Sequence, residues 1–581
     1  MRMLYRRLLD AARVPALLLI AAMLMTGLHP ALALAQETKK SKPQEIAKPV
    51  IVFNLASLNR VFDHAKFLFT DIERPELMDF LNAQLANVRD LKGVDRNRPG
   101  GLMIFLAEGL IPTPIPVAFV PISDINEFQQ TLATTPLKLK RASEGEDRYE
   151  ITQPSGQIQA VRLMHDYAFI AQSQEQLDRE FVNPAEFNQS LSNRYDLAVS
   201  ANLKTIPQPV KELLVNLIRT STQASMQQRD DEPEAGYRIR KAQAEGNLHT
   251  IEGILLEGDE ATIGARLDQK NRKASLEFIL RAKPDTGFAK ELAGQARPSY
   301  FAGAIDHLVP LSISMSGEIN DYSKKALAEY FKVFESEANR GLAKLPVGTK
   351  AEEIPQLEPI RGLFESLKAT VGGGHFDGFM QFFGDPTENF TIVGGVRLME
   401  GTKFGVGLTD ILNRLREDKS QFAVEMSAVS HQDVVFHRIK PNSIGNDNQK
   451  IYGDDAAIYV GTDNNAVWVA FGGKDALPKL RAAMDKVEES KAHAPKTEGL
   501  APFELVFNLN QWIKLQESKG LRRGPLAELT PKAFQQAGSD TLRVDMRPIE
   551  NGFRMRFQVE NGFLKLLGLG IARQIDGKEA P

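Results

Sequence analysis

Three side chains of the types that bind metal ions lie within one short segment. His431, Asp433 and His437 occupy alternate positions in HQDVVFH. If this segment is a β-strand, all three point to the same face, because side chains alternate along a strand. Two imidazoles and a carboxylate suit zinc or another transition metal. The two histidines would however lie roughly 20 Å apart. We therefore expect polar residues on the wet face of a sheet, and the three are weak metal candidates only.

A glycine-rich loop offers a second arrangement that is capable of chemistry. The segment VGGGHFDG places three glycines directly before His375 and Asp377. Consecutive glycines let backbone amides approach an anion, and a histidine with a carboxylate can transfer protons. Four phenylalanines follow closely, which favours a tight turn that leads into a buried strand. The turn is the preferred interpretation, and both residues stay weak catalytic candidates.

The common catalytic signatures are missing from the sequence. It contains no Gly-x-Ser-x-Gly elbow, P-loop, HExxH motif or EF-hand loop. It also contains no cysteine, which excludes disulfides, thiolate metal sites, haem attachment through CxxCH and a lipoprotein anchor. We predict no cofactor. Enzyme activity stays open, with a non-enzymatic protein as the preferred interpretation.

The first 35 residues predict an exported protein. Arginines precede an uncharged apolar stretch from Val14 to Leu28, and Pro30 and the small residues Ala33 and Ala35 follow. This order is typical of a cleavable secretory signal, and the apolar run is shorter than the roughly 20 residues that span a bilayer. We expect cleavage after Ala35, a periplasmic or extracellular location and no transmembrane helix in the mature chain.

The composition describes a folded and mildly acidic protein. Of the 581 residues, 43% are hydrophobic and 25% are charged, which are globular values. Removal of the leader changes the formal net charge from −3 to about −6. Without a basic stripe we expect no nucleic-acid partner. The length predicts more than one domain, since single cores seldom exceed about 250–300 residues. Residues 36–48 are polar and lysine-rich, which predicts a disordered spacer.

Sequence patterns recur in the two halves of the chain. Apolar and polar residues alternate over residues 263–280, which predicts a hairpin. The same pattern returns over residues 542–559, around a turn at Asn551-Gly552, and Asn-Gly is the strongest short signal for a hairpin turn. The tetrapeptide VFNL occurs at residues 52–55 and again at 506–509. Each copy reads as a strand that runs into a helix.

Two expected helix starts extend the repeated pattern. Ile122–Ile125 and Leu408–Ile411 each place a hydroxyl residue before an aspartate, which suits a helix N-terminus. Both halves then show, in order, strand and helix, capped helix, strand pair, strand and helix, hairpin and helix. We predict an α+β fold, with antiparallel sheets and helices packed on one face, built by tandem duplication of a module of about 250 residues. The modules would span residues 49–296 and 297–581.

These motifs carry a resemblance to a group of bacterial proteins. The VFNL unit, the SDI and TDI helix starts and the segment RLMHDYAFIAQSQEQL together resemble uncharacterised, cysteine-free secreted proteins of planctomycete-type bacteria. The resemblance covers most of the mature chain. It implies export and a repeated α+β module, and it implies no catalytic residue.

Three functions stay open at this point. The preferred one is a non-enzymatic periplasmic or envelope protein that binds an envelope protein or a small ligand, in a groove between the two halves, because ligands favour interfaces between domains. The second is a hydrolase that acts on envelope polymers through the His375 loop or the His431 segment. The third is a carrier of a lipid or other apolar ligand, which needs a curved sheet with apolar residues on its concave face.

Overall fold

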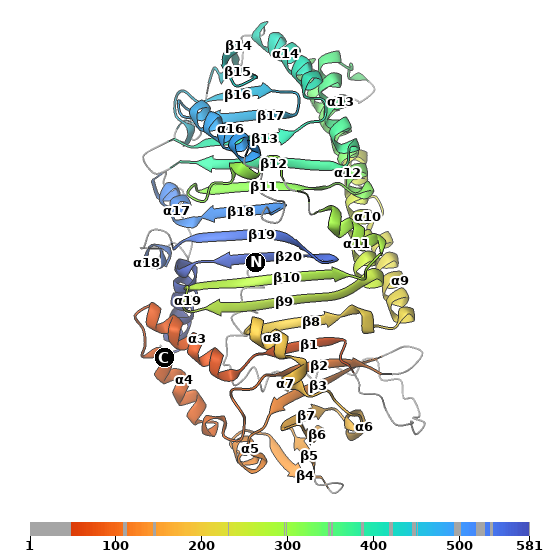
Figure 1. Ribbon diagram of the computed structural model, residues 1–581, viewed down its shortest axis with the longest axis vertical. Coiled ribbons are helices and arrows are strands. Elements are labelled where there is room, and N and C mark those ends of the chain that lie inside the picture. Colours follow the sequence, from red (N-terminus) through yellow and green to blue (C-terminus); the bar gives the residue numbers. More distant parts are fainter. Residues whose placement is uncertain are drawn as a thin grey trace.

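The computed structural model of the chain describes most residues between 48 and 579 (Figure 1). Within these bounds it leaves out residues 108–112, 143–146, 231, 296, 298, 347–348, 350–352, 385–388, 418–421, 444, 446–448, 450, 493–500, 519–528 and 535–538. The predicted signal peptide and nearly all of the predicted spacer lie outside the described residues.

Twenty strands alternate with helices along the chain. The first half contains β1 (Ile51–Leu55), β2 (Gly100–Leu106), β3 (Pro114–Pro121), β4 (Lys138–Arg141), β5 (Arg148–Thr152), β6 (Ile158–Met164), β7 (Tyr167–Ala171), β8 (Leu197–Asn202), β9 (Gly258–Asp268) and β10 (Lys273–Ala282). The second half contains β11 (Leu311–Glu318), β12 (His375–Phe383), β13 (Thr391–Arg397), β14 (Phe422–His431), β15 (Val434–Pro441), β16 (Ala457–Thr462), β17 (Ala466–Gly472), β18 (Phe503–Asn508), β19 (Thr541–Ile549) and β20 (Gly552–Val559).

The helices of the first half are α3 (Leu58–Asp71), α4 (Leu77–Ala86), α5 (Ile125–Leu132), α6 (Gln174–Leu177), α7 (Pro184–Phe187), α8 (Gln189–Arg194), α9 (Gln208–Ser225), α10 (Glu234–Glu257) and α11 (Gly287–Gly294). Those of the second half are α12 (Asp321–Leu342), α13 (Glu358–Gly372), α14 (Gly401–Glu417), α16 (Ala476–Ala492), α17 (Leu509–Ser518), α18 (Thr530–Ala533) and α19 (Asn561–Glu579).

All twenty strands form one antiparallel sheet. Its spatial order is β4-β5-β6-β7-β3-β2-β1-β8-β9-β10-β20-β19-β18-β11-β12-β13-β17-β16-β15-β14 (Figure 1). The predicted α+β class with antiparallel pairing is confirmed. The two predicted hairpins are also present, as β9–β10 and β19–β20, and Asn551 adopts the positive φ of 52° that its turn requires.

The two halves of the sheet have the same strand order. Counted outward from the centre, strands β10 to β4 follow one another as strands β20 to β14 do, and the last strands of the two halves, β10 and β20, pair with each other. The predicted boundary at residues 296 and 297 lies between α11 and β11. This shared order supports a tandem duplication, which stays a prediction.

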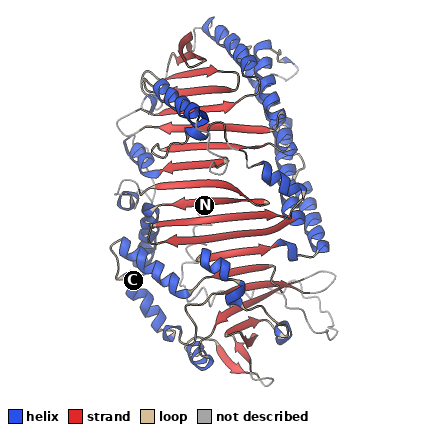
Figure 2. Ribbon diagram, in the orientation of Figure 1, coloured by secondary structure: helices blue, strands red, loops and turns tan. Residues whose placement is uncertain are grey.

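The helices lie mainly along the two ends of the strands. Helices α9, α10, α12, α13 and α14 follow one side of the sheet, and α3, α4, α17 and α19 follow the other (Figure 2). Two buried apolar clusters in the first half include β3 residues, one from each face: Ala118 packs with Phe128 of α5, and Val117 packs with Leu177 of α6. In the second half, Trp468 packs beneath α16. Between these clusters, no helix of the described residues crosses the middle of β10, β20, β19 and β18, whereas α8 contacts β1, β8 and β9 (Figure 1).

One of the two predicted helix starts is wrong. Helix α5 begins one residue later than expected, with Asp124 and not Ser123 as its N-cap, and the Asp124 carboxylate accepts hydrogen bonds from the amides of Asn126 and Glu127. Helix α14, by contrast, already begins at Gly401, so Thr409 and Asp410 lie within it. The apolar run before Thr409 is too short to distinguish a strand from a helix by its period.

Candidate functional site

The central strands bury their polar face and expose their apolar face. On β10, Glu277 is 3% exposed whereas its neighbour Leu276 is 46% exposed. On β11, Ser314 is 2% exposed and Met315 is 42% exposed. Alternation in a half-covered sheet normally places the apolar residues inside and the polar residues in water. The reversed burial therefore singles out the apolar face as a surface that can bind a partner or ligand.

Cross-strand register arranges this face into two continuous rows, because directly paired residues point to the same side. The first row runs from β1 to β17 through Phe53, Val199, Ile263, Phe278, Met555, Met546, Phe503, Met315, Gly378, Val396 and Val467. The second runs through Leu55, Leu197, Ala265, Leu276, Phe557, Val544, Leu505, Ile313, Met380, Gly394 and Val469. We call these two rows the apolar floor.

Every residue of the apolar floor is either apolar or glycine. Neighbouring strands are about 4.8 Å apart, so eleven strands give the floor a length of roughly 48 Å. Its most exposed side chains are between 37% and 53% exposed: Phe53, Leu197, Ile263, Leu276, Met315, Met380, Val469 and Phe557. Monomeric proteins seldom leave so long a run of large apolar side chains open to water unless it binds something.

Helices stand on the same side of the sheet at both ends of the strands. Leu280 and Phe553, one step beyond the floor, pack against residues of α10 and α11. At the other strand ends, Trp512 of α17 packs against Phe382 and Phe507, with ring centroids 5.3 and 6.0 Å away. At these two places, therefore, helices flank the floor beyond both ends of its two residue rows. We call the floor with these flanking helices the apolar trough.

The apolar trough ends differently in the two halves. In the first half, its floor leads from β1 to Leu102 and then to Ala118, in the buried apolar cluster beneath α5. In the second half the rows continue from Val467 and Val469 to Thr462 and Val460, and then to Val435 and His437. Thr462 and His437 are the first side chains along the rows that form hydrogen bonds.

A cleft of about 570 Å³ opens at this polar end. Its lining comes from one face of α14, from the β14–β15 hairpin and from the β16–β17 turn, and consists of Thr402, Gly405, Val406, Thr409, Asp410, Met426, Ser427, Asp433, Val435, His437, Thr462, Asp463 and Asn464. We call it the terminal cleft. A Cβ atom on Gly405 would lie 2.5 Å from the Thr462 hydroxyl, so this glycine lets α14 approach the strands.

His437 presents one defined hydrogen-bonding atom to the terminal cleft. Its Nδ1 accepts a hydrogen bond from the amide of Ser427, at 3.1 Å, so the proton of the neutral ring is on Nε2. Burial lowers the pKa of His437 below its ordinary value of 6.5, which keeps the ring neutral at pH 7. The Asp463 carboxylate stabilises the β16–β17 turn, because it accepts hydrogen bonds from the backbone amides of Asn465 and Ala466.

The HQDVVFH segment is a hairpin and not one strand. Strand β14 ends at His431, and β15 begins at Val434 after a turn in which Gln432 has a φ of 52°. Asp433 and His437 line the terminal cleft, whereas His431 Nε2 lies 2.8 Å from Asp485 of α16. Among the described residues there is no group of three or more metal-binding side chains that could hold an ion.

The second predicted pair forms part of the buried polar face. Asp377 is 1% exposed, and its carboxylate accepts hydrogen bonds from the Ser299 hydroxyl and the Tyr300 amide, both at 2.6 Å. Burial raises the pKa of Asp377 and lowers that of His375. His375 Nε2 lies 3.2 Å from the Ser316 hydroxyl. Neither residue lines the cavity at α3, the terminal cleft or the cavity beside Phe187 and Asn202. The pair fastens the segment before β11 to the sheet.

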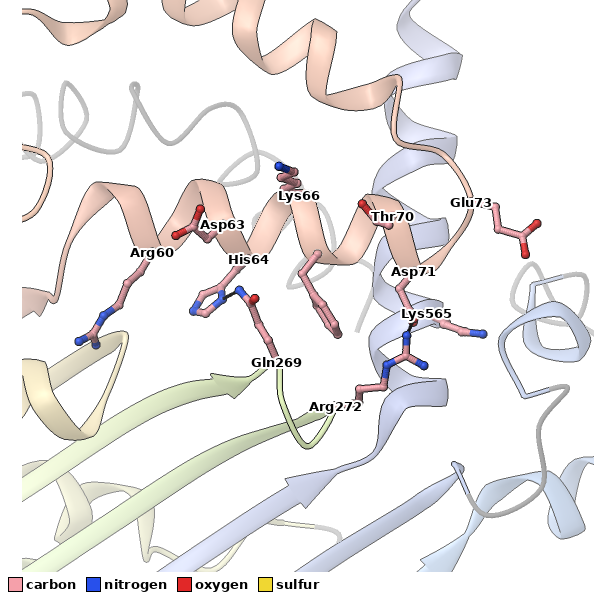
Figure 3. A pocket seen from close by; sticks show the side chains of 11 residues that line it. Arg60, Asp63, His64, Lys66, Thr70, Asp71, Glu73, Gln269, Arg272 and Lys565 are labelled. Carbon is pink, nitrogen blue, oxygen red and sulfur yellow. Dashed lines mark hydrogen bonds and ion pairs between the residues drawn. The ribbon is translucent and has the colours of Figure 1, made fainter.

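A cavity of about 620 Å³ lies between α3, the β9–β10 turn and α19 (Figure 3). His64 Nδ1 accepts from the Gln269 amide at 2.8 Å, and its Nε2 lies 3.0 Å from Asp196. Burial alone would raise the pKa of Asp196, but hydrogen bonds from His64 and a backbone amide lower it overall. Arg272 pairs with Asp71 at 2.8 Å. Because both nitrogens of His64 are engaged, these groups serve to connect the elements.

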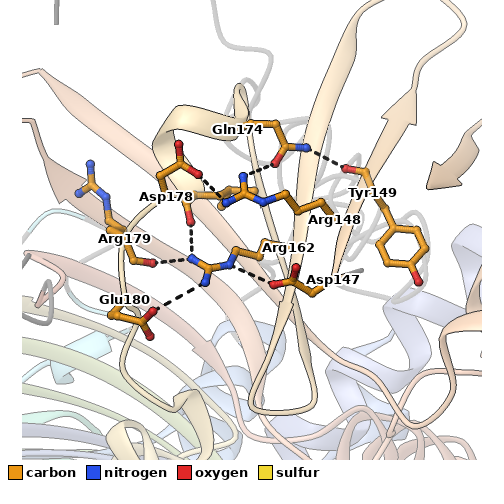
Figure 4. A network of polar contacts seen from close by, with 9 residues as sticks. Asp147, Arg148, Tyr149, Arg162, Gln174, Asp178, Arg179 and Glu180 are labelled. Atoms are coloured by element: carbon orange, nitrogen blue, oxygen red, sulfur yellow. Dashed lines mark hydrogen bonds and ion pairs between the residues drawn. The ribbon is translucent and has the colours of Figure 1, made fainter. Parts of the chain in front are cut away.

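A polar network near the other end of the first half is also saturated with internal contacts (Figure 4). Arg162 donates to Asp147 and to the Leu177 carbonyl oxygen, at 3.3 and 2.9 Å. Arg148 donates to Asp178 at 2.7 Å. The network joins β5 and β6 to α6. Of the surfaces described, the apolar trough with its terminal cleft is the one that leaves a long continuous run of apolar side chains open to a ligand.

Sequence reasoning did not identify this surface. The alternation in β9, β10, β19 and β20 indicated the apolar rows, but not that they stay uncovered. In α14, the spacing of Thr402, Val406 and Thr409 places them on one helical face. The wrong prediction that a helix starts at Thr409 divided this segment and concealed the shared face. Asp433 and His437 were singled out, although for a metal.

Comparisons of the chain with family models, curated proteins and solved structures found no match. No helix in the described parts of the chain combines the length and the apolar character that a bilayer span requires.

Proposed function

We propose that this protein is a non-enzymatic exported protein that binds and carries an apolar ligand, with the hydrocarbon chains of a lipid in the apolar trough. The observation that carries the proposal is the apolar floor, which crosses eleven strands without one polar side chain. A hydrocarbon chain needs no hydrogen bond, so it is matched to such a surface along its entire length. Each half-exposed side chain of the floor that the ligand covers would contribute on the order of 1 kcal/mol to the free energy of binding.

The dimensions of the trough favour chains over a flat protein partner. Side chains two positions apart on a strand are about 7 Å from each other, so the two rows between the helices accommodate one or two chains side by side. One leaflet of a bilayer contributes about half of its 30 Å hydrocarbon thickness. The trough, at roughly 48 Å, exceeds the length of a single lipid tail. A second copy of the sheet would meet the helices that stand at both strand ends.

Export and duplication belong to the same proposal. The signal sequence would place the chain outside the cytoplasm, where lipids move between membranes through water. Duplication of a ten-strand module is supported by the shared strand order and by the pairing of β10 with β20, which joins two short floors into one long floor. N-terminal sequencing of the protein recovered from the periplasm or medium is expected to begin at Gln36. An unprocessed Met1 would contradict export by this route.

The test of lipid binding compares the two faces of neighbouring strands of the sheet. Leu276 and Phe557 are cross-strand partners on the floor, and Leu276→Gln with Phe557→Gln places two amides in the trough. We expect this double variant to lose binding of a fluorescent fatty alcohol by roughly tenfold or more, since about 1 kcal/mol is lost at each site. Arg266→Gln, at an exposed position on the opposite face of β9, is the matched control and should bind as the unmodified chain does.

Two measurements complete this experiment. Native mass spectrometry of the purified chain should detect bound lipid, and circular dichroism should show the same fold in all variants. Equal binding by the floor variant and the control would contradict the proposal. If a second copy of the chain covers the floor instead, the unmodified protein should be a dimer and the double variant a monomer. That result would also overturn the carrier function.

A further inference from the structure

We infer that the terminal cleft binds the polar head of the ligand whose chains lie in the apolar trough, and that this head bears a protonated amine. The inference rests on the proposed function and extends it. It begins from continuity: the two rows of the floor run directly into the cleft, through Thr462 on one row and His437 on the other. A chain that lies on the part of the floor next to β16 can therefore bring its head to these side chains.

The other end of the trough is unsuited to a polar head. There the first row leads through Leu102 to Ala118 of β3, and Ala118 is 2% exposed within the apolar cluster that includes Phe128 of α5. A polar head placed among these residues would lose its hydrogen bonds to water without replacement. The ligand thus has one favourable orientation, with its head towards β15 and its chain ends towards β1.

The charge of the terminal cleft selects the kind of head. Asp410, Asp433 and Asp463 line it, and no described lining residue carries a positive charge. Asp410 and Asp433 are exposed to solvent within the cleft, so both can meet a ligand, while Asp463 adds negative charge from its turn. A phosphate or carboxylate would be repelled by these groups, whereas an ammonium group would be attracted and would find acceptor oxygens.

The neutral side chains of the cleft suit the atoms that join a head to its chain. His437 offers one donor, the Nε2 hydrogen, because its Nδ1 already accepts from the Ser427 amide. A carbonyl, ester or hydroxyl oxygen next to the amine would accept this hydrogen bond. The hydroxyls of Thr409 and Thr462 also line the cleft and can serve as donors or acceptors. The site therefore combines two exposed carboxylates for the cation, neither of them paired with a described residue, with donors for the linking oxygen.

The experiment uses three amphiphiles with the same chain: cetylamine, cetyl alcohol and palmitate. Each is titrated into the purified mature chain at pH 7 and low salt, and its Kd is measured. We expect cetylamine to bind roughly tenfold more tightly than palmitate, the sum of two modest ion pairs on a partly exposed surface. Asp410→Asn with Asp433→Asn should remove most of this preference and leave the Kd of cetyl alcohol unchanged.

A second pair of substitutions controls for net charge. Asp166→Asn with Asp321→Asn changes the charge by the same amount at side chains that are 81% and 87% exposed and lie outside the cleft. This control should keep the preference for the amine. If the preference disappears in the control as well, or survives in the cleft variant, the inference is wrong. Ethanolamine alone should bind far more weakly than cetylamine, because it lacks the chain.

The outcomes also separate this inference from the function on which it rests. If cetyl alcohol binds and the floor variant loses it, the trough binds chains whatever the cleft does. If all three amphiphiles bind equally, the head site is overturned and the carrier function stands. If none of them binds, the carrier function itself fails.

Discussion

The two faces of the central sheet differ in burial: one is buried and hydrogen-bonded, and the other, where we propose that the ligand binds, is open. On the polar face of β10, Glu277 is 3% exposed and accepts hydrogen bonds from Arg194, Tyr195 and Arg556, at 2.7, 2.9 and 2.7 Å. On the apolar face of the same strand, Leu276 is 46% exposed. The buried face is thus held by charge-assisted hydrogen bonds, and the open face is kept free of them. The difference shows that a strand with alternating polar and apolar residues can bury either its polar or its apolar side chains.

The largest expected effect comes from breaking the polar face at the junction of the two halves. Glu277 on β10 and Arg556 on β20 are register partners. Burial raises the pKa of Glu277, but hydrogen bonds from Tyr195 and Arg556 with the charge of Arg194 lower it overall. We expect Glu277→Gln to lower the free energy of unfolding by about 2–4 kcal/mol, because the cations lose a charged acceptor. Urea denaturation measures the change.

The same network gives a pH dependence with a defined sign. Because the folded pKa of Glu277 lies below its ordinary value of 4.5, its contribution is complete above pH 4.5 and is lost as the pH falls through the folded pKa. The Glu277→Gln variant should therefore show a smaller loss of stability below pH 4.5 than the unmodified chain. Glu550→Gln, in the exposed β19–β20 turn, is the control, and an equal effect there would contradict the assignment.

An unpaired cation on α9 provides the next largest effect, in the opposite direction. Lys211 is 1% exposed, and its ammonium group has no hydrogen-bond partner. Burial and then the charge of Lys283 lower its pKa from 10.5 to about 8. We expect Lys211→Met to raise the free energy of unfolding at pH 7 by roughly 1–3 kcal/mol, since it removes a buried polar group that nothing satisfies.

The sign of the pH effect at Lys211 follows from its lowered pKa. Between pH 8 and 10.5 the unfolded chain binds more protons than the folded chain, so stability rises with pH over this window. The rise should be absent in Lys211→Met and present in Lys290→Met, a substitution at an exposed lysine on α11. Unfolding curves recorded at pH 7 and pH 10 measure both variants. A rise of the same size in Lys211→Met would contradict the lowered pKa.

The strands of the central sheet could be predicted from the sequence, but the burial of their faces could not. Period-two alternation predicted the β9–β10 and β19–β20 hairpins, because local side-chain direction fixes it. Alternation separates the apolar from the polar face, but it does not determine which of the two faces is covered. The covered face depends on where helices distant in the sequence, such as α16 and α17, pack. His437 was recognised by its type alone. Its neighbours in the terminal cleft, Asp410 and Thr462, come from α14 and β16, and only the tertiary fold brings the three together.

The smallest expected effect is the most direct test of the division between the faces. If the apolar floor serves binding and not stability, Leu276→Gln should change the free energy of unfolding by less than about 0.5 kcal/mol, as at an ordinary surface position. Leu480 of α16 is fully buried beneath its helix, and Leu480→Gln should cost several times more, roughly 3 kcal/mol or above. Thermal unfolding of the two variants measures the contrast. A large loss at Leu276 would mean that the floor is covered in the folded chain, and the open face would then have to be assigned elsewhere.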